Sequence, residues 1–239
     1  MIYPQDRNRH RPLHLFNQGE IYLVTGRNYK KTAYFSGPKK EIIRNCLIAA
    51  IKKYQPTIYA WAILNSHYHL LLSFDGRDEL VSVGCDELSP SGSEGEIRCH
   101  GKFELVVRND NEFRSPRHSP GSLNSSDPGD GLSGRNQLAR FIQYIHRGSA
   151  RVINKIDHQP GRKVWYQYWD SSIKREKDFY TCFNYIHLNP IKHGLIKNLK
   201  ELKNYPFCSY QAWLAKMGKE WLKEIIAGYP IEGCRLEVD

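Results

Sequence analysis

The hydrophobic pattern along the chain predicts two folded stretches separated by a polar segment. In Lys39–Tyr54 and Gln137–Ile156, apolar residues recur every three or four positions, the spacing of an amphipathic helix. Glu176–Leu188 has the same periodicity, and Asn189-Pro190 directly after it predicts the helix end. Short runs rich in β-branched and aromatic residues predict four extended segments: Glu20–Gly26, Thr57–Asn65, His67–Phe74 and Lys163–Ile173.

The order of these elements predicts the fold class. Strands and helices follow one another as β-α-β-β-α-β-α, with the middle two strands joined by a short break at Ser66. This order favours an α+β domain in which an antiparallel sheet carries its helices packed on one face. The sequence therefore predicts a ferredoxin-like (RRM-like) plan.

Residues 81–136 differ in composition from the rest of the chain. They contain 8 Gly, 10 Ser and 4 Pro but only two aromatic residues, so they cannot bury enough apolar surface to offset their ordering entropy. We interpret them as a disordered or loosely ordered insertion, in which Lys102–Arg108 is a possible short strand. The predicted division is a first half of one domain (1–80), the insertion (81–136), a second half (137–213), and a C-terminal helix and tail (214–239).

The charge balance indicates a polyanionic partner. The 239 residues carry 35 Lys and Arg against 25 Asp and Glu, a net charge of +10. Because the insertion holds nine acidic and six basic residues, the positive charge belongs to the folded part, as is typical of nucleic-acid binding. The six cysteines form no CxxC pair, which argues against a cysteine zinc site. With no long apolar run and no signal-like start, we expect a cytoplasmic protein without a membrane partner.

His67 and His69 are the first candidate site. They stand two apart on a predicted strand, so both side chains point to the same face. Two adjacent imidazoles can hold one divalent metal ion, and the strongly apolar surrounding strands make a pair of histidines there unusual. A solvated or hydrogen-bonded pair without a metal remains the alternative from the residues alone.

Tyr185 is the second candidate. It lies four residues before Asn189 on the third predicted helix, so the two side chains share a helix face. A phenol beside a carboxamide can act as a nucleophile beside a metal ligand. The chain has 15 tyrosines, however, and one on an amphipathic helix is more often a packing or interface residue.

Aromatic and basic residues interleave around the fourth predicted strand. Stacking faces with nearby cations suit single-stranded nucleic acid, although a core strand flanked by solvated charges gives the same composition. No phosphate-binding loop, GxGxxG, HExxH or GxSxG motif accompanies them. The candidate DNA contacts are Arg27, Arg147, Arg151, Lys155, Trp165, Trp169, Lys174 and Arg175.

At four segments the sequence resembles the HUH-superfamily tyrosine transposases that act on single-stranded DNA, with the REP-associated tyrosine transposases as the nearest branch. The segments are WAILNSHYHLLL, LARFIQYIHRGSARVINK, WYQYWDSSIKREKDFYTCFNYIHLNPIKHGLI and YPFCSYQAWL. They occur in the family's order and cover most of residues 15–76 and 137–226, whereas residues 81–136 do not match.

The resemblance implies a function. The HUH histidine pair falls on His67 and His69, the nucleophile on Tyr185, and a further metal ligand on Asn189. It implies a Mg²⁺ or Mn²⁺ ion and a substrate of single-stranded DNA with a hairpin or palindromic repeat. The implied enzyme is a metal-dependent endonuclease that nicks and transfers strands in DNA transposition or mobilisation of repeated elements. Its intermediate is a 5′-phosphotyrosine, and it works as a monomer or a homodimer.

Two other functions remain compatible with the sequence. The first is a catalytically silent DNA-binding protein derived from the same family, which the 56-residue insertion mildly favours. The second is an RNA-binding module, because a ferredoxin-like sheet with exposed aromatic residues also suits RNA. Cleavage of a single-stranded oligonucleotide discriminates the first from an enzyme, and comparison of RNA with DNA binding discriminates the second.

Overall fold

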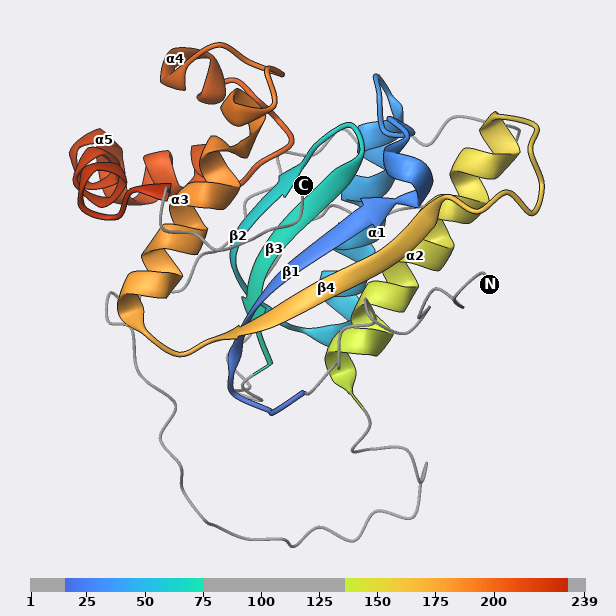
Figure 1. The fold of residues 1–239 in the computed structure, drawn as a ribbon, viewed down its shortest axis with the longest axis horizontal. Helices are drawn as coiled ribbons and strands as arrows, with labels where there is room; N and C mark the ends of the chain where they lie inside the picture. Colours follow the sequence, from blue (N-terminus) through green and yellow to red (C-terminus); the bar gives the residue numbers. More distant parts are fainter. Residues whose placement is uncertain (1–15, 75–135, 232–239) are drawn as a thin grey trace, which may run out of the picture.

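The computed structural model describes residues 16–74 and 136–231. Its helices and strands follow the predicted order, with the bounds of the first two long helices as predicted and the strands within a few residues (Figure 1). The elements are β1 (Ile21–Asn28), η1 (Tyr29–Lys31), α1 (Lys39–Tyr54), β2 (Thr57–Ile63), β3 (His67–Ser73), α2 (Gln137–Ile156), β4 (Trp165–Ile173), α3 (Glu176–Lys192), α4 (Leu199–Leu202) and α5 (Tyr210–Gly228).

The four strands form one antiparallel sheet in the order β2-β3-β1-β4. β1 therefore lies between β3 and β4, and the helices α1 and α2 connect strands that are not neighbours. This order is that of the ferredoxin-like plan, so the predicted α+β fold class is confirmed.

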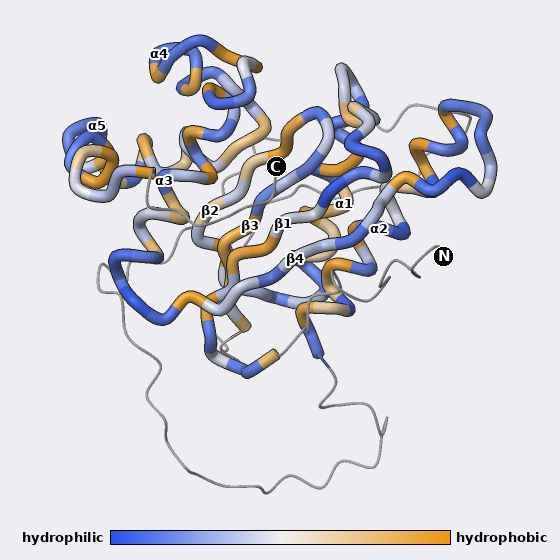
Figure 2. The backbone as a smooth tube through the Cα atoms, viewed as in Figure 1, coloured by the Kyte–Doolittle hydropathy of each residue, from blue (hydrophilic) through white to orange (hydrophobic). Residues whose placement is uncertain are grey.

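One face of the sheet is covered by α1 and α2. Alternate strand residues such as Tyr22, Val24 and Leu70 point to this face and are at most 1% exposed. Phe141 and Ile142 of α2 complete the same core. Figure 2 shows hydrophobic residues concentrated along the middle strands, whereas the loop between α2 and β4 is hydrophilic. The layer formed by α1 and α2 on this face is the one that the sequence predicted.

The opposite face is also partly covered, which corrects the prediction of helices on one face only. Leu71 and Leu23 point away from α1 and α2 and form a second core with residues of α3 and α5. Small residues on β2, Ala60 and Ala62, let α3 approach the sheet closely and are fully buried. Figure 1 shows α3, α4 and α5 grouped at the β2 side of the sheet, with β4 at the other edge.

The third helix does not end at Asn189-Pro190, as its sequence predicted. It continues to Lys192 with Pro190 inside the helix. Proline removes only one backbone donor, and the turn beyond it is closed by the His193 amide, which donates to the Asn189 carbonyl at 2.9 Å. The longer helix encloses Asn189, which is 1% exposed, and brings Lys192 onto the same helix as Tyr185.

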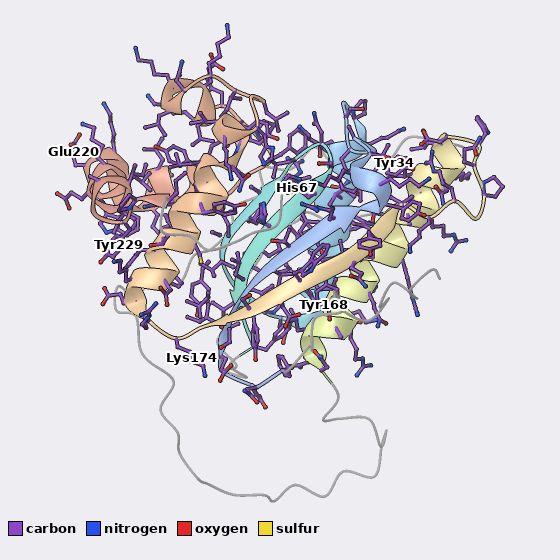
Figure 3. All side chains as sticks on the ribbon, viewed as in Figure 1. Tyr34, His67, Tyr168, Lys174, Glu220 and Tyr229 are labelled. Carbon is purple, nitrogen blue, oxygen red and sulfur yellow. The ribbon has the colours of Figure 1, made fainter. Side chains whose placement is uncertain are left out.

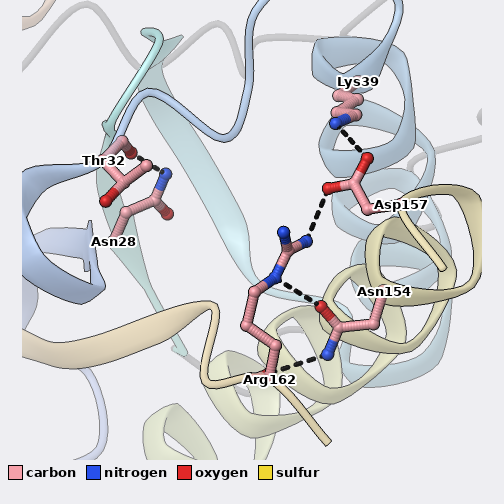
Figure 4. Close-up of polar contacts among 6 residues, drawn as sticks. All are labelled: Asn28, Thr32, Lys39, Asn154, Asp157 and Arg162. Carbon is pink, nitrogen blue, oxygen red and sulfur yellow. Dashed lines mark hydrogen bonds and ion pairs between the residues drawn. The ribbon is translucent and has the colours of Figure 1, made fainter. Parts of the chain in front are cut away.

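An ionic cluster holds the loop between α2 and β4 against α1. The carboxylate of Asp157 binds both Lys39 and Arg162, and the Arg162 Nε donates to Asn154 at 3.0 Å (Figure 4). The two cations lower the pKa of the Asp157 carboxyl. The cluster therefore fixes the point at which the chain enters β4.

Two further predictions concern the insertion and the C-terminal helix. Most of residues 81–136, including the possible strand Lys102–Arg108, lies outside the described residues; Asn136 caps α2 by accepting from the Ala139 amide at 2.9 Å. The C-terminal helix begins at Tyr210, ahead of the predicted boundary at 213/214. The division of the chain into parts remains a prediction.

Candidate active site

The two histidines of β3 lie side by side on the face that α3 covers. Their ring centroids are 4.9 Å apart, and Tyr68 between them points to the opposite face. On β1, Arg27 is the partner of His67 and Thr25 is the partner of His69. The strand alternation that the sequence predicted therefore holds, and Figure 3 shows His67 over the middle of the sheet.

His69 is the more enclosed of the pair. It is 1% exposed, and its Nδ1 lies 2.8 Å from the Thr25 hydroxyl. Its Nε2 has no hydrogen-bond partner among the described residues. Burial, followed by the positive charges of neighbouring residues, holds the pKa of the His69 imidazole well below its usual range. His69 is therefore neutral at pH 7, the form that coordinates a metal ion.

His67 lies at the rim of the site and is half-buried. Its Nδ1 is 3.1 Å from the Ser66 hydroxyl, in the short turn between β2 and β3. A third imidazole, that of His193, lies 4.8 Å from the His67 ring by centroid. His193 follows α3 directly and is exposed.

Tyr185 of α3 faces the histidine pair. Its ring centroid lies 5.2 Å from that of His69, and the side chain is 5% exposed. The ammonium of Lys192 lies 5.3 Å from the centre of the Tyr185 ring. Tyr185 also belongs to the second core, so the same ring packs there and faces His69.

Asn189 lies one helical turn after Tyr185 on α3. Its Nδ2 donates to the Tyr185 carbonyl at 3.2 Å, and its Oδ1 has no hydrogen-bond partner among the described residues. A buried, unpartnered amide oxygen and the unpartnered His69 Nε2 are both atoms that a bound ion would satisfy. No group of three or more His, Cys, Asp and Glu side chains is arranged to hold a metal within the described ranges. The candidate donors are two imidazoles and a carboxamide.

The predicted DNA contacts are divided between different parts of the fold. Trp169 lies on the histidine face, with the Arg27 guanidinium 5.6 Å from its ring centre. Trp165 lies in the opposite core, where its ring stacks on His146 at 4.1 Å. The remaining cations lie on α2, which covers the other face, or at the far end of β4, where Figure 3 shows Lys174: Arg147, Arg151, Lys155, Lys174 and Arg175.

Comparisons with known proteins agree with this fold. No family model matches the chain. Over 67 residues it is 29% identical to the REP-associated tyrosine transposase of Escherichia coli (strain K12), a match that covers 27% of this chain and 39% of that protein. A solved structure of a REP-associated tyrosine transposase bound to a REP hairpin superimposes with a TM-score of 0.52 and 14% identity, covering 87% of each chain.

The predicted resemblance to REP-associated tyrosine transposases is thus confirmed. The sequence match spans well under half of the E. coli protein, and the structural match at 14% identity shows a shared fold. Among the described residues, no helix is both long enough and apolar enough to cross a membrane.

Sequence reasoning missed three residues at the site. Thr25 could not be recognised in the sequence, because only the strand register shows that it pairs with His69. Lys192 and His193 were placed beyond the helix, since Pro190 predicted its end. A signal was present: Tyr185, Asn189 and His193 follow one another at intervals of four, the spacing of one helix face.

Proposed function

We propose that this protein is an enzyme that nicks and rejoins single-stranded DNA next to a hairpin, with Tyr185 as the nucleophile. The observation that carries the proposal is the position of the Tyr185 ring, 5.2 Å from that of His69. Asn189, whose Oδ1 has no partner among the described residues, lies one helical turn further along the same helix. The partial sequence match to a tyrosine transposase supports the same chemistry.

The residues present fit a divalent cation such as Mg²⁺ or Mn²⁺. His67 and His69 would hold it through neutral imidazoles, and Asn189 through its amide oxygen. When bound, the ion supplies Lewis acidity toward the scissile phosphate. The Thr25 hydroxyl, 2.8 Å from His69 Nδ1, would accept the Nδ1 proton in the tautomer that leaves the Nε2 lone pair available for coordination.

The phenol of Tyr185 would attack the phosphorus of the scissile phosphodiester. A bond forms between the phenolic oxygen and phosphorus, the bond to the 3′ oxygen breaks, and the phenolic proton balances the departing 3′-oxygen charge. The Lys192 ammonium, 5.3 Å from the ring centre, favours negative charge on the phenol during attack. The products are a 5′-phosphotyrosine and a free 3′-OH, and the reverse attack rejoins a strand without a nucleotide cofactor.

The proposed substrate is a single strand that carries a hairpin or palindromic repeat. The structural relative is a transposase bound to a REP hairpin, and the net charge of +10 on this chain suits a phosphate backbone. Because the reaction transfers a strand rather than hydrolysing it, the proposed biological role is DNA transposition or mobilisation of repeated palindromic elements.

A covalent-adduct assay tests this function. Wild-type protein, Tyr185→Phe and Tyr180→Phe would each be mixed with a randomised pool of hairpin-bearing single strands, with and without Mn²⁺, and resolved on a denaturing gel. Tyr180 lies on the same helix with its ring against Tyr229, so Tyr180→Phe is the matched control. We expect an adduct that needs Mn²⁺, persists in Tyr180→Phe and is lost in Tyr185→Phe. Absence of any adduct from folded wild-type protein would leave only a silent DNA- or RNA-binding protein.

A further inference from the structure

The face that bears the histidines extends beyond α3 to the β4 edge. Trp169 of β4 is the partner of Thr25 on β1, and Thr25 is in turn the partner of His69 on β3. Residues paired across antiparallel strands share a face, so Trp169 lies in the same row as His69. Two strand spacings separate them, roughly 10 Å.

Three aromatic rings continue from this row along the surface. The ring centroids of Trp169 and Tyr166 are 6.2 Å apart, and those of Tyr166 and Tyr29 are 6.3 Å apart. Tyr166 is 45% exposed, one of four large hydrophobic side chains exposed within the described ranges. We call these three residues the aromatic ladder.

Cations lie over each ring of the aromatic ladder. The Arg27 guanidinium is 5.6 Å from the Trp169 ring centre. The Lys163 ammonium is 5.3 Å from that of Tyr166 and 4.9 Å from that of Tyr29. Rings with cations above them offer stacking surfaces and phosphate neutralisation at the same place.

The contrast with Trp165 on the same strand shows that the ladder is not core packing. Trp165 is 7% exposed, and its Nε1 donates to the Ser149 hydroxyl at 3.0 Å. Tyr166, the next residue, turns to the surface, where β4 departs from regular pairing with β1 between Gly26 and Asn28. This irregularity places Tyr166 between Trp169 and Tyr29.

We propose that the aromatic ladder binds unpaired nucleotides that flank the hairpin, with bases stacked on Trp169 and Tyr166 and phosphates near Arg27 and Lys163. This inference rests on the proposed function and assigns the part of the substrate that approaches the histidine pair from the β4 edge. Single-stranded nucleotides are the favoured occupant because their bases are free to stack on rings, whereas the bases of a hairpin stem stack on one another.

The experiment separates unpaired nucleotides from the stem. Fluorescence anisotropy would measure binding of one blunt hairpin and of the same hairpin with oligo(dT) tails, without metal and in a Tyr185→Phe background. The variants are Trp169→Leu and Tyr166→Leu, which keep an apolar side chain but remove the ring. The control is Tyr144→Leu, because Tyr144 on α2 is also exposed and has the Lys53 ammonium 5.1 Å from its ring centre.

We expect each ladder variant to lose roughly 5-fold to 100-fold in affinity for the tailed hairpin while binding the blunt hairpin as before. Tyr144→Leu should match the background on both, and Trp169→Phe should recover most of the lost affinity. Unchanged affinity for the tailed hairpin, or an equal loss on the blunt one, would overturn the proposal. Tyr166 is exposed, so its variant tests the ladder even if Trp169→Leu lowers the melting temperature.

Failure of the ladder and failure of the proposed function give different results. The binding assay uses neither metal nor nucleophile, so a normal covalent adduct with no effect of the ladder variants rejects the ladder alone. Loss of tail affinity in both ladder variants, combined with no adduct from wild type, keeps the ladder and rejects the nicking reaction.

Discussion

His146 and His69 lie on opposite faces of the sheet, and their ring nitrogens differ in their hydrogen-bond partners. On the α1–α2 face, His146 stacks on Trp165, and its Nε2 lies 3.0 Å from the Tyr68 hydroxyl. On the α3 face, His69 has its Nδ1 paired with Thr25 but its Nε2 without a partner among the described residues. Tyr68 and His69 are neighbours on β3, so one strand supplies both environments.

The two imidazoles therefore differ in whether Nε2 has a partner. A buried polar atom without a partner costs about 1–3 kcal/mol, and a bound ion would remove that cost at His69. Packing on the α1–α2 face instead fixes the position of β3, which carries both histidines. Gly26 lies under Tyr68, and an added Cβ would be 2.4 Å from the Tyr68 ring, so only glycine allows this close approach. Tyr68 packed in this way fixes the strand that carries His67 and His69.

Alanine substitutions of the two imidazoles should separate the faces most strongly. We expect His69→Ala to lose Mn²⁺ binding and to reduce adduct formation on the order of 100-fold or more, with the protein still folded. His146→Ala should lose about 1–3 kcal/mol of unfolding free energy, because the buried Tyr68 hydroxyl loses its partner. Mn²⁺ titration calorimetry, adduct gels and urea unfolding measure these effects. Equal Mn²⁺ affinity in the wild type and His69→Ala would reject His69 as a ligand.

Thr25→Val gives the next largest effect and tests how the site is positioned. Valine keeps the shape but removes the hydroxyl that lies 2.8 Å from His69 Nδ1. We expect Mn²⁺ affinity to fall about 10-fold to 100-fold, as for other residues that orient metal ligands. Thr25→Ser keeps the hydroxyl and should restore affinity. A purely structural role for Thr25 would instead lower the melting temperature of both variants and leave Mn²⁺ affinity unchanged.

Much of the fold could be predicted because its signals are local. The helical spacing in Lys39–Tyr54 and Gln137–Ile156 determined both helices, since each has one continuous apolar side. The alternation of β3 also predicted that His67 and His69 share one face. These features depend only on residues that are near one another in sequence.

The features that were missed depend on long-range packing. Pro190 predicts a helix end, but burial of α3 against β2 offsets one lost hydrogen bond and carries the helix to Lys192. The partnership of Thr25 with His69 spans 44 residues and follows from strand register alone. Trp165 and Trp169 look alike in sequence, yet irregular pairing of β4 places one in the core and the other on the histidine face.

Acid unfolding gives the smallest effect and sharpens the comparison further. Enclosure between Trp165 and Tyr68 lowers the pKa of His146 to about 3, and burial lowers the pKa of His69 well below its ordinary value. Within the described ranges, the titratable rings of Tyr68 and Tyr168 face His146, and burial raises the pKa of both, so both are uncharged in acid.

An imidazole with a depressed folded pKa stabilises the protein above pH 6.5, and this stability is lost as the pH falls from 6.5 toward the folded value. Each such group contributes up to about 1.4 kcal/mol per pH unit. Urea unfolding between pH 6.5 and 4.5 should therefore have a shallower slope in His146→Ala and, separately, in His69→Ala, although only the second loses Mn²⁺ binding. An unchanged slope in His146→Ala would mean that His146 takes up its proton in the folded protein at the same pH as in the unfolded chain. If the two variants change the pH slope equally but only His69→Ala loses Mn²⁺ binding, the two imidazoles are equally buried in effect. The difference between the faces then lies in the unpartnered Nε2 of His69.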